Sequence, residues 1–189
     1  MKLLALMTIF ALALPVAHAA DAGAPAKTAA APSHRVELKA AQGSPLPYTI
    51  EVPADWEVRQ VAGFPGLWIG PADAKPPEDP RLIWVRGSMV ELADPDKVVA
   101  NIKVNDAHDP KWSAPRVEVK DVGGVRGVLV QMNTGEGAKA RSSLTLKLPL
   151  DKVSVDLVTS ATQAEFPQRA ALYERILLST RPAAAPPAK

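Results

Sequence analysis

The chain has 189 residues, with 22 Lys and Arg against 20 Asp and Glu, and it contains no Cys. Because the basic residues are interspersed among acidic ones, the sequence lacks the basic stripe that nucleic-acid-binding proteins use to contact phosphates. The absence of Cys excludes disulfides, thiolate metal sites, a Cys nucleophile and the Cys-linked lipid of bacterial lipoproteins.

Residues 1–19 have the pattern of a cleavable secretory signal peptide. Lys2 precedes an apolar run from residue 3 to residue 14, and Ala17-His18-Ala19 supplies the small residues of a cleavage site. The apolar run is shorter than the roughly 20 residues that span a bilayer. We therefore expect cleavage after Ala19, a periplasmic or secreted location, and no transmembrane segment in the exported chain.

The two ends of the exported chain differ in composition from its middle. Residues 20–33 and 182–189 are rich in Ala and Pro and have no large apolar side chains that could offset the entropy of ordering. We expect a disordered linker and a disordered tail. Residues 34–181 then form one domain of about 150 residues, which is long enough to bury about two-thirds of its unfolded-chain surface.

Alternating apolar and polar residues predict half-buried strands at 34–40 and 48–52. Pro53-Ala54-Asp55 predicts a turn before a further strand at 56–58. Residues 67–69 are a short apolar run between two glycines, and the proline-rich segment 71–80 is predicted to be a surface loop.

Residues 81–90 carry apolar side chains on both faces of a predicted strand. Such a strand belongs in the middle of a sheet that is covered on both sides. Asp94 followed by Pro95 predicts the start of a helix that ends before Pro110.

The second half of the domain is predicted to be strands followed by a helix. The glycine pair in 122–125 predicts a tight hairpin between strands at 117–119 and 125–132. Alternation predicts two more strands, at 144–150 and 153–157, each with one buried and one wetted face. Apolar residues at helical spacing follow from Phe166 to Leu177, after a separate turn at 162–165. This order predicts an α+β fold with a mostly antiparallel sheet.

Two segments resemble the PsbP-like fold family. Residues 48–56, Tyr-Thr-Ile-Glu-Val-Pro-Ala-Asp-Trp, are similar to the strand that opens the family's domain. Residues 173–181, Tyr-Glu-Arg-Ile-Leu-Leu-Ser-Thr-Arg, are similar to its closing helix. The resemblance implies a central antiparallel sheet flanked by helices on both faces, an α/β/α sandwich. It also implies action by binding other proteins, and it carries over no catalytic residue.

Candidate chemistry concentrates in the segment that follows the predicted helix. Asp106, His108 and Asp109 could supply oxygen and nitrogen ligands to a divalent metal, although adjacency in sequence does not ensure convergent geometry. Gly87-Ser88 lacks the second glycine of a hydrolase nucleophile elbow, and Gly123-Gly124 lacks a nucleotide-binding pattern. We therefore expect no cofactor and no catalytic residue.

Large aromatic residues offer a second kind of candidate site. Trp56, Trp68 and Trp84 fall in apolar strand patterns and are expected in the core. Trp112 lies in a polar segment and is a candidate exposed anchor, with Lys111 and His108 as neighbouring binding residues. The segments 105–115 and 71–80 are the predicted contact surfaces.

The leading functional hypothesis is an exported, non-catalytic envelope protein that binds another protein or peptide of unidentified nature. One alternative is a periplasmic metal-dependent or hydrolytic enzyme that uses Asp106, His108 and Asp109. A second alternative is a binder of small apolar ligands between the sheet and a helix.

Overall fold

The computed structural model describes residues 32–40, 45–60, 66–77, 79–106 and 112–184. These residues belong to the unit that begins at Ala31. The predicted signal peptide and most of the predicted linker and tail lie outside the described residues. No helix in the described part of the chain is long and apolar enough to cross a membrane.

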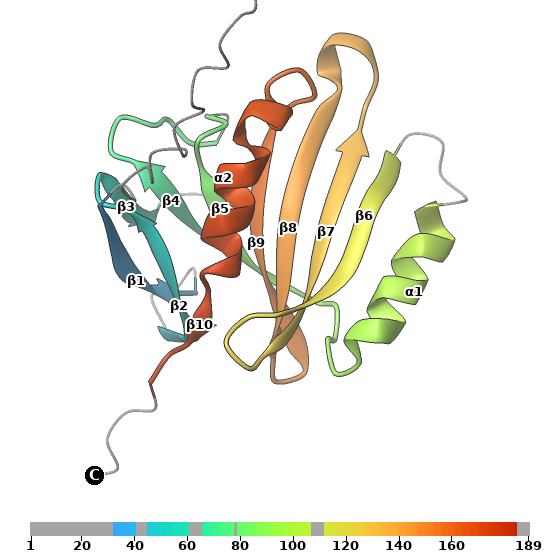
Figure 1. The fold of residues 1–189 in the computed structure, drawn as a ribbon, viewed down its shortest axis with the longest axis horizontal. Helices are drawn as coiled ribbons and strands as arrows, with labels where there is room; N and C mark the ends of the chain where they lie inside the picture. Colours follow the sequence, from blue (N-terminus) through green and yellow to red (C-terminus); the bar gives the residue numbers. More distant parts are fainter. Residues whose placement is uncertain (1–31, 41–44, 61–65, 78, 107–111, 185–189) are drawn as a thin grey trace, which may run out of the picture. The chain divides into compact units, whose positions relative to one another are not determined.

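The strands form two antiparallel sheets. The smaller sheet has the order β1 (Ser33–Lys39), β2 (Pro45–Pro53), β10 (Arg181–Pro182). The larger sheet has the order β3-β4-β5-β9-β8-β7-β6, and Figure 1 shows it running across the unit. Its strands in chain order are β3 (Trp56–Gln60), β4 (Leu67–Pro71), β5 (Ile83–Ser88), β6 (Trp112–Asp121), β7 (Arg126–Thr134), β8 (Arg141–Leu150) and β9 (Val153–Thr162).

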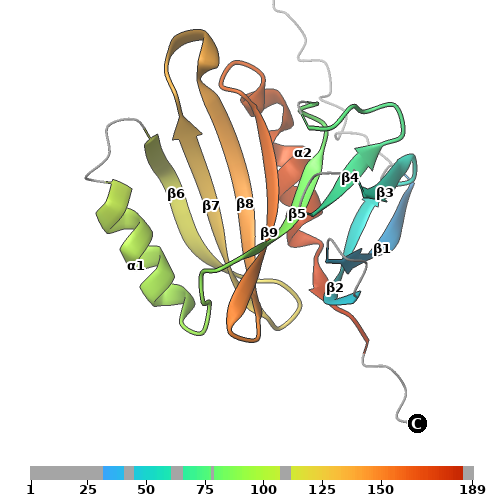
Figure 2. The same cartoon turned by 180° about the vertical axis from the view of Figure 1, so that it is seen from behind.

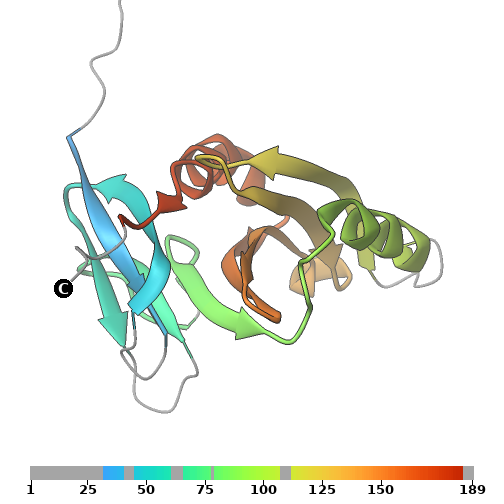
Figure 3. The ribbon, with the colours of Figure 1, turned by 90° about the horizontal axis from the view of Figure 1, so that it is seen from below.

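The described residues also form two α-helices and one short 3-10 helix, η1 (Gly137–Lys139). Helix α1 (Pro95–Asp106) packs on β6 and β7, and α2 (Phe166–Leu178) packs on β8 and β9 and on β2 of the smaller sheet. Figures 1 and 2 show α2 in front of β8 and β9 in one view and behind them in the reverse view. Figure 3 shows the smaller sheet and α1 at opposite sides of the larger sheet.

The main core lies between α2 and the two sheets. The buried side chains of α2, including Tyr173 and Leu177, pack with Ile50 and Val52 of β2 and with the leucines of β8. A second apolar cluster lies under α1, where Val117, Val128 and Val130 are buried. On β7, Leu129 belongs to the first cluster while its neighbours 128 and 130 belong to the second, because successive residues of a strand point to opposite faces.

The predicted α+β class with antiparallel strands is confirmed. The described strands form two sheets, because the chain turns at Ala54-Asp55 and β3 enters the larger sheet instead of extending the smaller one. The sandwich layering stays a prediction, since α1 packs mainly at the β6 and β7 edge. The predicted helix start is confirmed, because the Asp94 side chain accepts a hydrogen bond from the Lys97 backbone N–H at 3.2 Å as an N-cap. The predicted hairpin is also confirmed, because Gly123 and Gly124 have φ angles of 68° and 86°, which the tight turn requires.

Three local expectations are wrong. β5 ends at Ser88, and Met89 and Val90 are 91% and 43% exposed instead of packed in a central strand. Trp112 is the first residue of β6, opposite Thr134, because pairing with β7 extends the strand into the predicted loop. The predicted wet face of β8 and β9 is covered in part, since Thr145, Ser154 and Asp156 are buried.

Candidate functional site

A cavity of about 550 Å³ lies where the smaller sheet meets β5 and the β8–β9 hairpin, and we call it the inter-sheet pocket. Its volume falls in the range of 300–1,000 Å³ that is typical of ligand sites. It is lined by Lys39, Ala40, Leu46, Gly66, Trp84, Val85, Arg86, Gly87, Ser88, Met89, Leu150, Val153 and Val155.

The pocket lies beside the point where the described pairing of β5 with β4 stops. β4 begins at Leu67, opposite Val85, and residues 61–65 lie outside the described residues. Arg86, Gly87 and Ser88 still pair with β9 on the other side. Within the described residues, these three positions therefore have no strand partner on the β4 side.

Gly66 brings the chain close to β5 at the edge of the pocket. Its φ is +134°, and a Cβ there would lie 2.4 Å from the Val85 carbonyl oxygen and 2.5 Å from the Trp84 Nε1 atom. Only glycine avoids both the steric clash and the backbone strain. Gly87 is the opposite case, because a Cβ there would meet none of the described heavy atoms within 4 Å.

The floor of the pocket is apolar and its rim carries an exposed apolar side chain. Leu46, Val85 and Val155 are buried, and Leu150 and Val153 are half-buried. Met89 lines the pocket and is 91% exposed. An exposed methionine beside an apolar cavity is typical of adaptable binding surfaces.

Three charged side chains stand opposite one another on adjacent strands, on the face of the sheet opposite to Val85 and Val155. Asp156 of β9 is paired in register with Arg86 of β5 and with Lys147 of β8. The Lys147 Nζ atom lies 2.7 Å from Asp156 Oδ2, whereas the nearest Arg86 nitrogen lies 3.9 Å away. Ser154 donates a long hydrogen bond of 3.4 Å to the other carboxylate oxygen. Lys147 therefore neutralises the buried carboxylate, and the positive charge of Arg86 remains in excess.

Arg86 is held over an aromatic ring. Its guanidinium carbon lies 4.7 Å from the centroid of the Trp84 ring, which stacks on Trp68 at 5.4 Å with an interplanar angle of 16°. A cation over a tryptophan face at such a partly exposed site is stabilised by about 0.5–1 kcal/mol. The geometry restrains the guanidinium, and no acceptor among the described residues lies within hydrogen-bond distance of it.

The residues described as lining the pocket are mostly apolar. Ser88 is the one hydroxyl among them, and the described lining includes no histidine or carboxylate that could activate it. The Arg86 side chain lies on the opposite face of β5, at Asp156 and the Trp84 ring. The lining combines an apolar floor with the exposed cation Lys39. That combination fits a group with an apolar body and a negative charge.

The residues predicted as metal ligands or contacts are not brought together by the described structure. His108, Asp109 and Lys111 lie outside the described residues. Asp106 ends α1 and Trp112 begins β6, and the structure describes neither side chain. Among the residues that it does describe, no group of three His, Asp or Glu residues could hold a metal. The predicted roles of these residues remain predictions.

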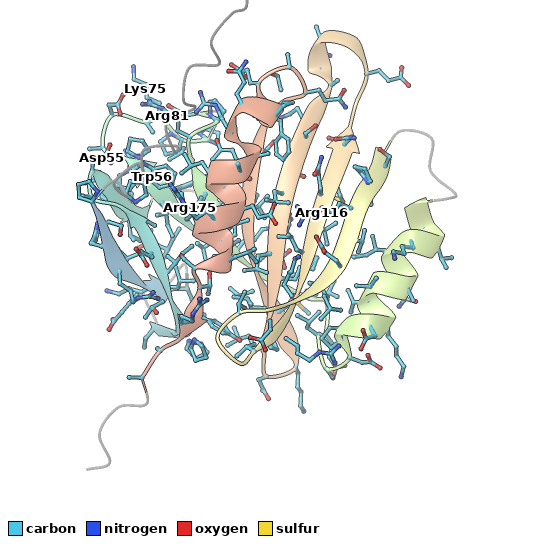
Figure 4. All side chains as sticks on the ribbon, in the orientation of Figure 1. Asp55, Trp56, Lys75, Arg81, Arg116 and Arg175 are labelled. Atoms are coloured by element: carbon cyan, nitrogen blue, oxygen red, sulfur yellow. The ribbon has the colours of Figure 1, made fainter. Side chains whose placement is uncertain are left out.

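The predicted surface segment 71–80 is fixed by ion pairs around Arg81. The Arg81 side chain contacts Asp79 at 2.8 Å and Asp73 at 2.9 Å, and Figure 4 labels it near Lys75. The hydrogen bond from Arg81 lowers the pKa of Asp79 from 3.8 to about 2. Ala74 is buried together with Trp68 and Leu82, so this segment anchors the entry to β5.

A second ion-pair network ties α2 to β6. Arg116, labelled in Figure 4, donates to both carboxylate oxygens of Glu174 at 2.6 and 2.7 Å. These hydrogen bonds lower the pKa of Glu174. The bidentate geometry is typical of an arginine–carboxylate pair that fixes orientation.

The pocket was not predicted from the sequence. The apolar-ligand hypothesis had placed a cavity between the sheet and a helix, whereas the inter-sheet pocket lies between the two sheets. The sequence offered one sign of an exposed apolar surface, because the apolar pair Met89-Val90 follows Ser88. Their exposure depends on where β5 ends, which local alternation does not reveal.

No protein-family model and no curated protein matches the chain. Among solved structures, it is similar to cyanobacterial PsbP (CyanoP) from Synechocystis sp. PCC 6803, with a TM-score of 0.52 and 16% identity over 85% of this chain and 98% of that one. It is also similar to LpqN of Mycobacterium tuberculosis, described as involved in cell envelope biogenesis, with a TM-score of 0.48 and 17% identity over 79% and 90% of the two chains. At this level of identity the likeness to CyanoP shows the fold, and the predicted PsbP-like fold is confirmed.

Proposed function

We propose that this chain is an exported, non-catalytic protein of the cell envelope that binds another protein or a peptide at the inter-sheet pocket. The observation that carries the proposal is the apolar pocket with the exposed Met89 at its rim. The predicted signal peptide supports the location. The PsbP-like fold supports a binding role by analogy alone.

The apolar rim supports a partner of protein size. Met89 is almost fully exposed, and burial of an apolar side chain of this size contributes about 1.5–3 kcal/mol. The methionine side chain has three rotatable bonds and adapts to different partner surfaces.

The predicted segment 105–115, with Trp112, Lys111 and His108, is kept in the proposal as a separate contact surface. Trp112 starts an edge strand of the larger sheet, whereas the pocket adjoins β5 near the opposite edge. The two surfaces can therefore be tested independently.

Site-specific photocrosslinking in the native envelope tests the proposal. A benzophenone side chain is placed at position 89, at position 112, or at the control position Val104, an apolar residue of α1 that is 59% exposed. We expect a discrete protein adduct from position 89 and none from position 104. Adducts from position 112 alone would move the interface to the predicted loop, and an absence of protein adducts from position 89 would contradict the proposed site.

A further inference from the structure

The inter-sheet pocket and the exposed Met89 at its rim complement each other. Building on the proposed function, we infer that the protein bound at the pocket is a second copy of this chain. Each copy inserts Met89 into the pocket of the other, which makes a two-fold symmetric dimer. The inference rests on the proposed function and deepens it, because it names the partner.

The pocket has room for a slender apolar side chain. Val85 and Val155 are buried at its floor, and Gly87 pairs with Val155 in register and lies on the same face of β5 as Val85. A Cβ at Gly87 would meet none of the described heavy atoms within 4 Å. Methionine suits such a space, because its unbranched side chain has three rotatable bonds and fills irregular apolar gaps.

Met89 is available to another molecule. It lines the pocket and is 91% exposed, so its side chain does not fill the pocket of its own copy. Val90 follows it and is 43% exposed. Removing these apolar side chains from water favours association, since apolar burial is the main favourable contribution to most protein interfaces.

The charges on either side of the pocket favour a second copy as the partner. Lys39 lies at the pocket on the smaller sheet, and Glu91 lies two residues beyond Met89. Both are exposed, and neither has an ion-pair partner among the described residues. Figure 2 shows the chain running from β5 toward α1, away from the smaller sheet. The surface therefore presents a cation, the pocket, Met89 and an anion in that order, and we call it the self-contact patch.

This order makes the self-contact patch complementary to itself. A two-fold axis that passes between the pocket and Met89 places two patches against each other in opposite directions. Each Met89 then enters the pocket of the other copy, and each Lys39 lies opposite a Glu91. In such an isologous interface every contact occurs twice, so one patch supplies two apolar insertions and two pairs of opposite charge. The charge pairs fix the orientation of the two copies.

The size of the self-contact patch predicts a weak dimer. Thirteen residues line the pocket, whereas a stable interface uses about 20–30 residues on each side. Ion pairs between exposed side chains add little affinity. We therefore expect monomer and dimer to exchange, with the dimer prevailing at high protein concentration.

Analytical ultracentrifugation of the purified exported protein at increasing concentration tests the inference. We expect the average mass to rise from that of one copy toward that of two. Met89→Ser should weaken dimerisation at least about tenfold. The matched control Val104→Ser, at an apolar residue of α1 that is 59% exposed, should leave it unchanged. Both side chains are exposed, so both variants should fold, and thermal unfolding checks this.

An exchange of charges tests the two-fold arrangement. Lys39→Glu or Glu91→Lys alone places like charges opposite each other in both pairs and should weaken dimerisation. The double variant Lys39→Glu/Glu91→Lys should restore it. An equal mixture of the two single variants should also dimerise, because each pair then joins an acid to a base. A structural role of either residue predicts neither recovery.

The outcomes distinguish this inference from the proposed function. A monomer at every concentration up to about 1 mM overturns the second copy as partner, and so does dimerisation that Met89→Ser leaves unchanged. Failure of both the double variant and the mixture to recover overturns the two-fold arrangement. In each case a position 89 adduct to a different protein would still support the proposed function. A monomer together with no protein adduct from position 89 contradicts both.

Discussion

The two halves of β5 differ in what lies beside them. Ile83, Trp84 and Val85 pair with β4 on one side and β9 on the other, and Ile83 and Val85 are completely buried. Arg86, Gly87 and Ser88 pair with β9 alone among the described residues, and they line the pocket. One strand therefore contributes first to the core and then to a candidate site, and its described pairing with β4 stops at Val85, opposite Leu67, where β4 begins.

The largest effect is expected where the buried half of β5 is truncated. Ile83→Ala removes a side chain with no exposed surface and should lower the free energy of unfolding by about 2–5 kcal/mol. Ser88→Ala, in the open half, should change it by less than about 0.5 kcal/mol. Urea denaturation of both variants measures the difference, and equal effects would show that the two halves are packed alike.

Gly66, where the chain comes close to β5, sharpens the comparison. Gly66→Ala should lower the free energy of unfolding by about 1–3 kcal/mol, because φ is +134° and the new methyl would meet the Val85 carbonyl. Urea denaturation of the Gly66→Ala variant measures this change in the free energy of unfolding. A neutral Gly66→Ala variant would contradict the close approach at this edge.

The loop that leads into the buried half should show a pH dependence. The pKa of Asp79 is lowered to about 2 from 3.8 by Arg81, so its contribution to stability is present above pH 3.8 and is lost as the pH falls through about 2. We expect the free energy of unfolding to fall by about 1–2 kcal/mol over this range. Asp79→Asn should remove that part of the pH profile, and an unchanged profile would argue against the Arg81 contact.

The smallest expected effect has the opposite sign. Gly87→Ala places a methyl in space that the described residues leave open and restricts the unfolded chain, so it should raise the free energy of unfolding by about 0.4–1 kcal/mol. Thermal unfolding measures the gain. Destabilisation instead would mean that the space beside Gly87 is filled in the folded protein.

The alternation of side chains predicted most strands but misjudged one face of β8 and β9. Ser154 and Asp156 fall at positions that alternate with Val155 and Leu157, so the pattern indicated that they were wetted. In the fold they are buried, since Asp156 is paired with Lys147 across the sheet and Arg86 stands on its other side. A polar pattern cannot distinguish a solvated face from one whose charges are satisfied by neighbouring strands.

The sequence by itself determined the local elements of this protein. The Asp94 cap, the glycine turn at 123–124, the alternating strands and the amphipathic α2 depend on residues close together in the chain, and for this reason they were predictable. Tertiary structure alone decided the division into two sheets, the pairing of β5 with β4 and β9, and the meeting of Lys39, Leu46 and Val155 at one pocket. These features depend on which strands lie side by side, and pairing between distant segments is not written in the periodicity of either one.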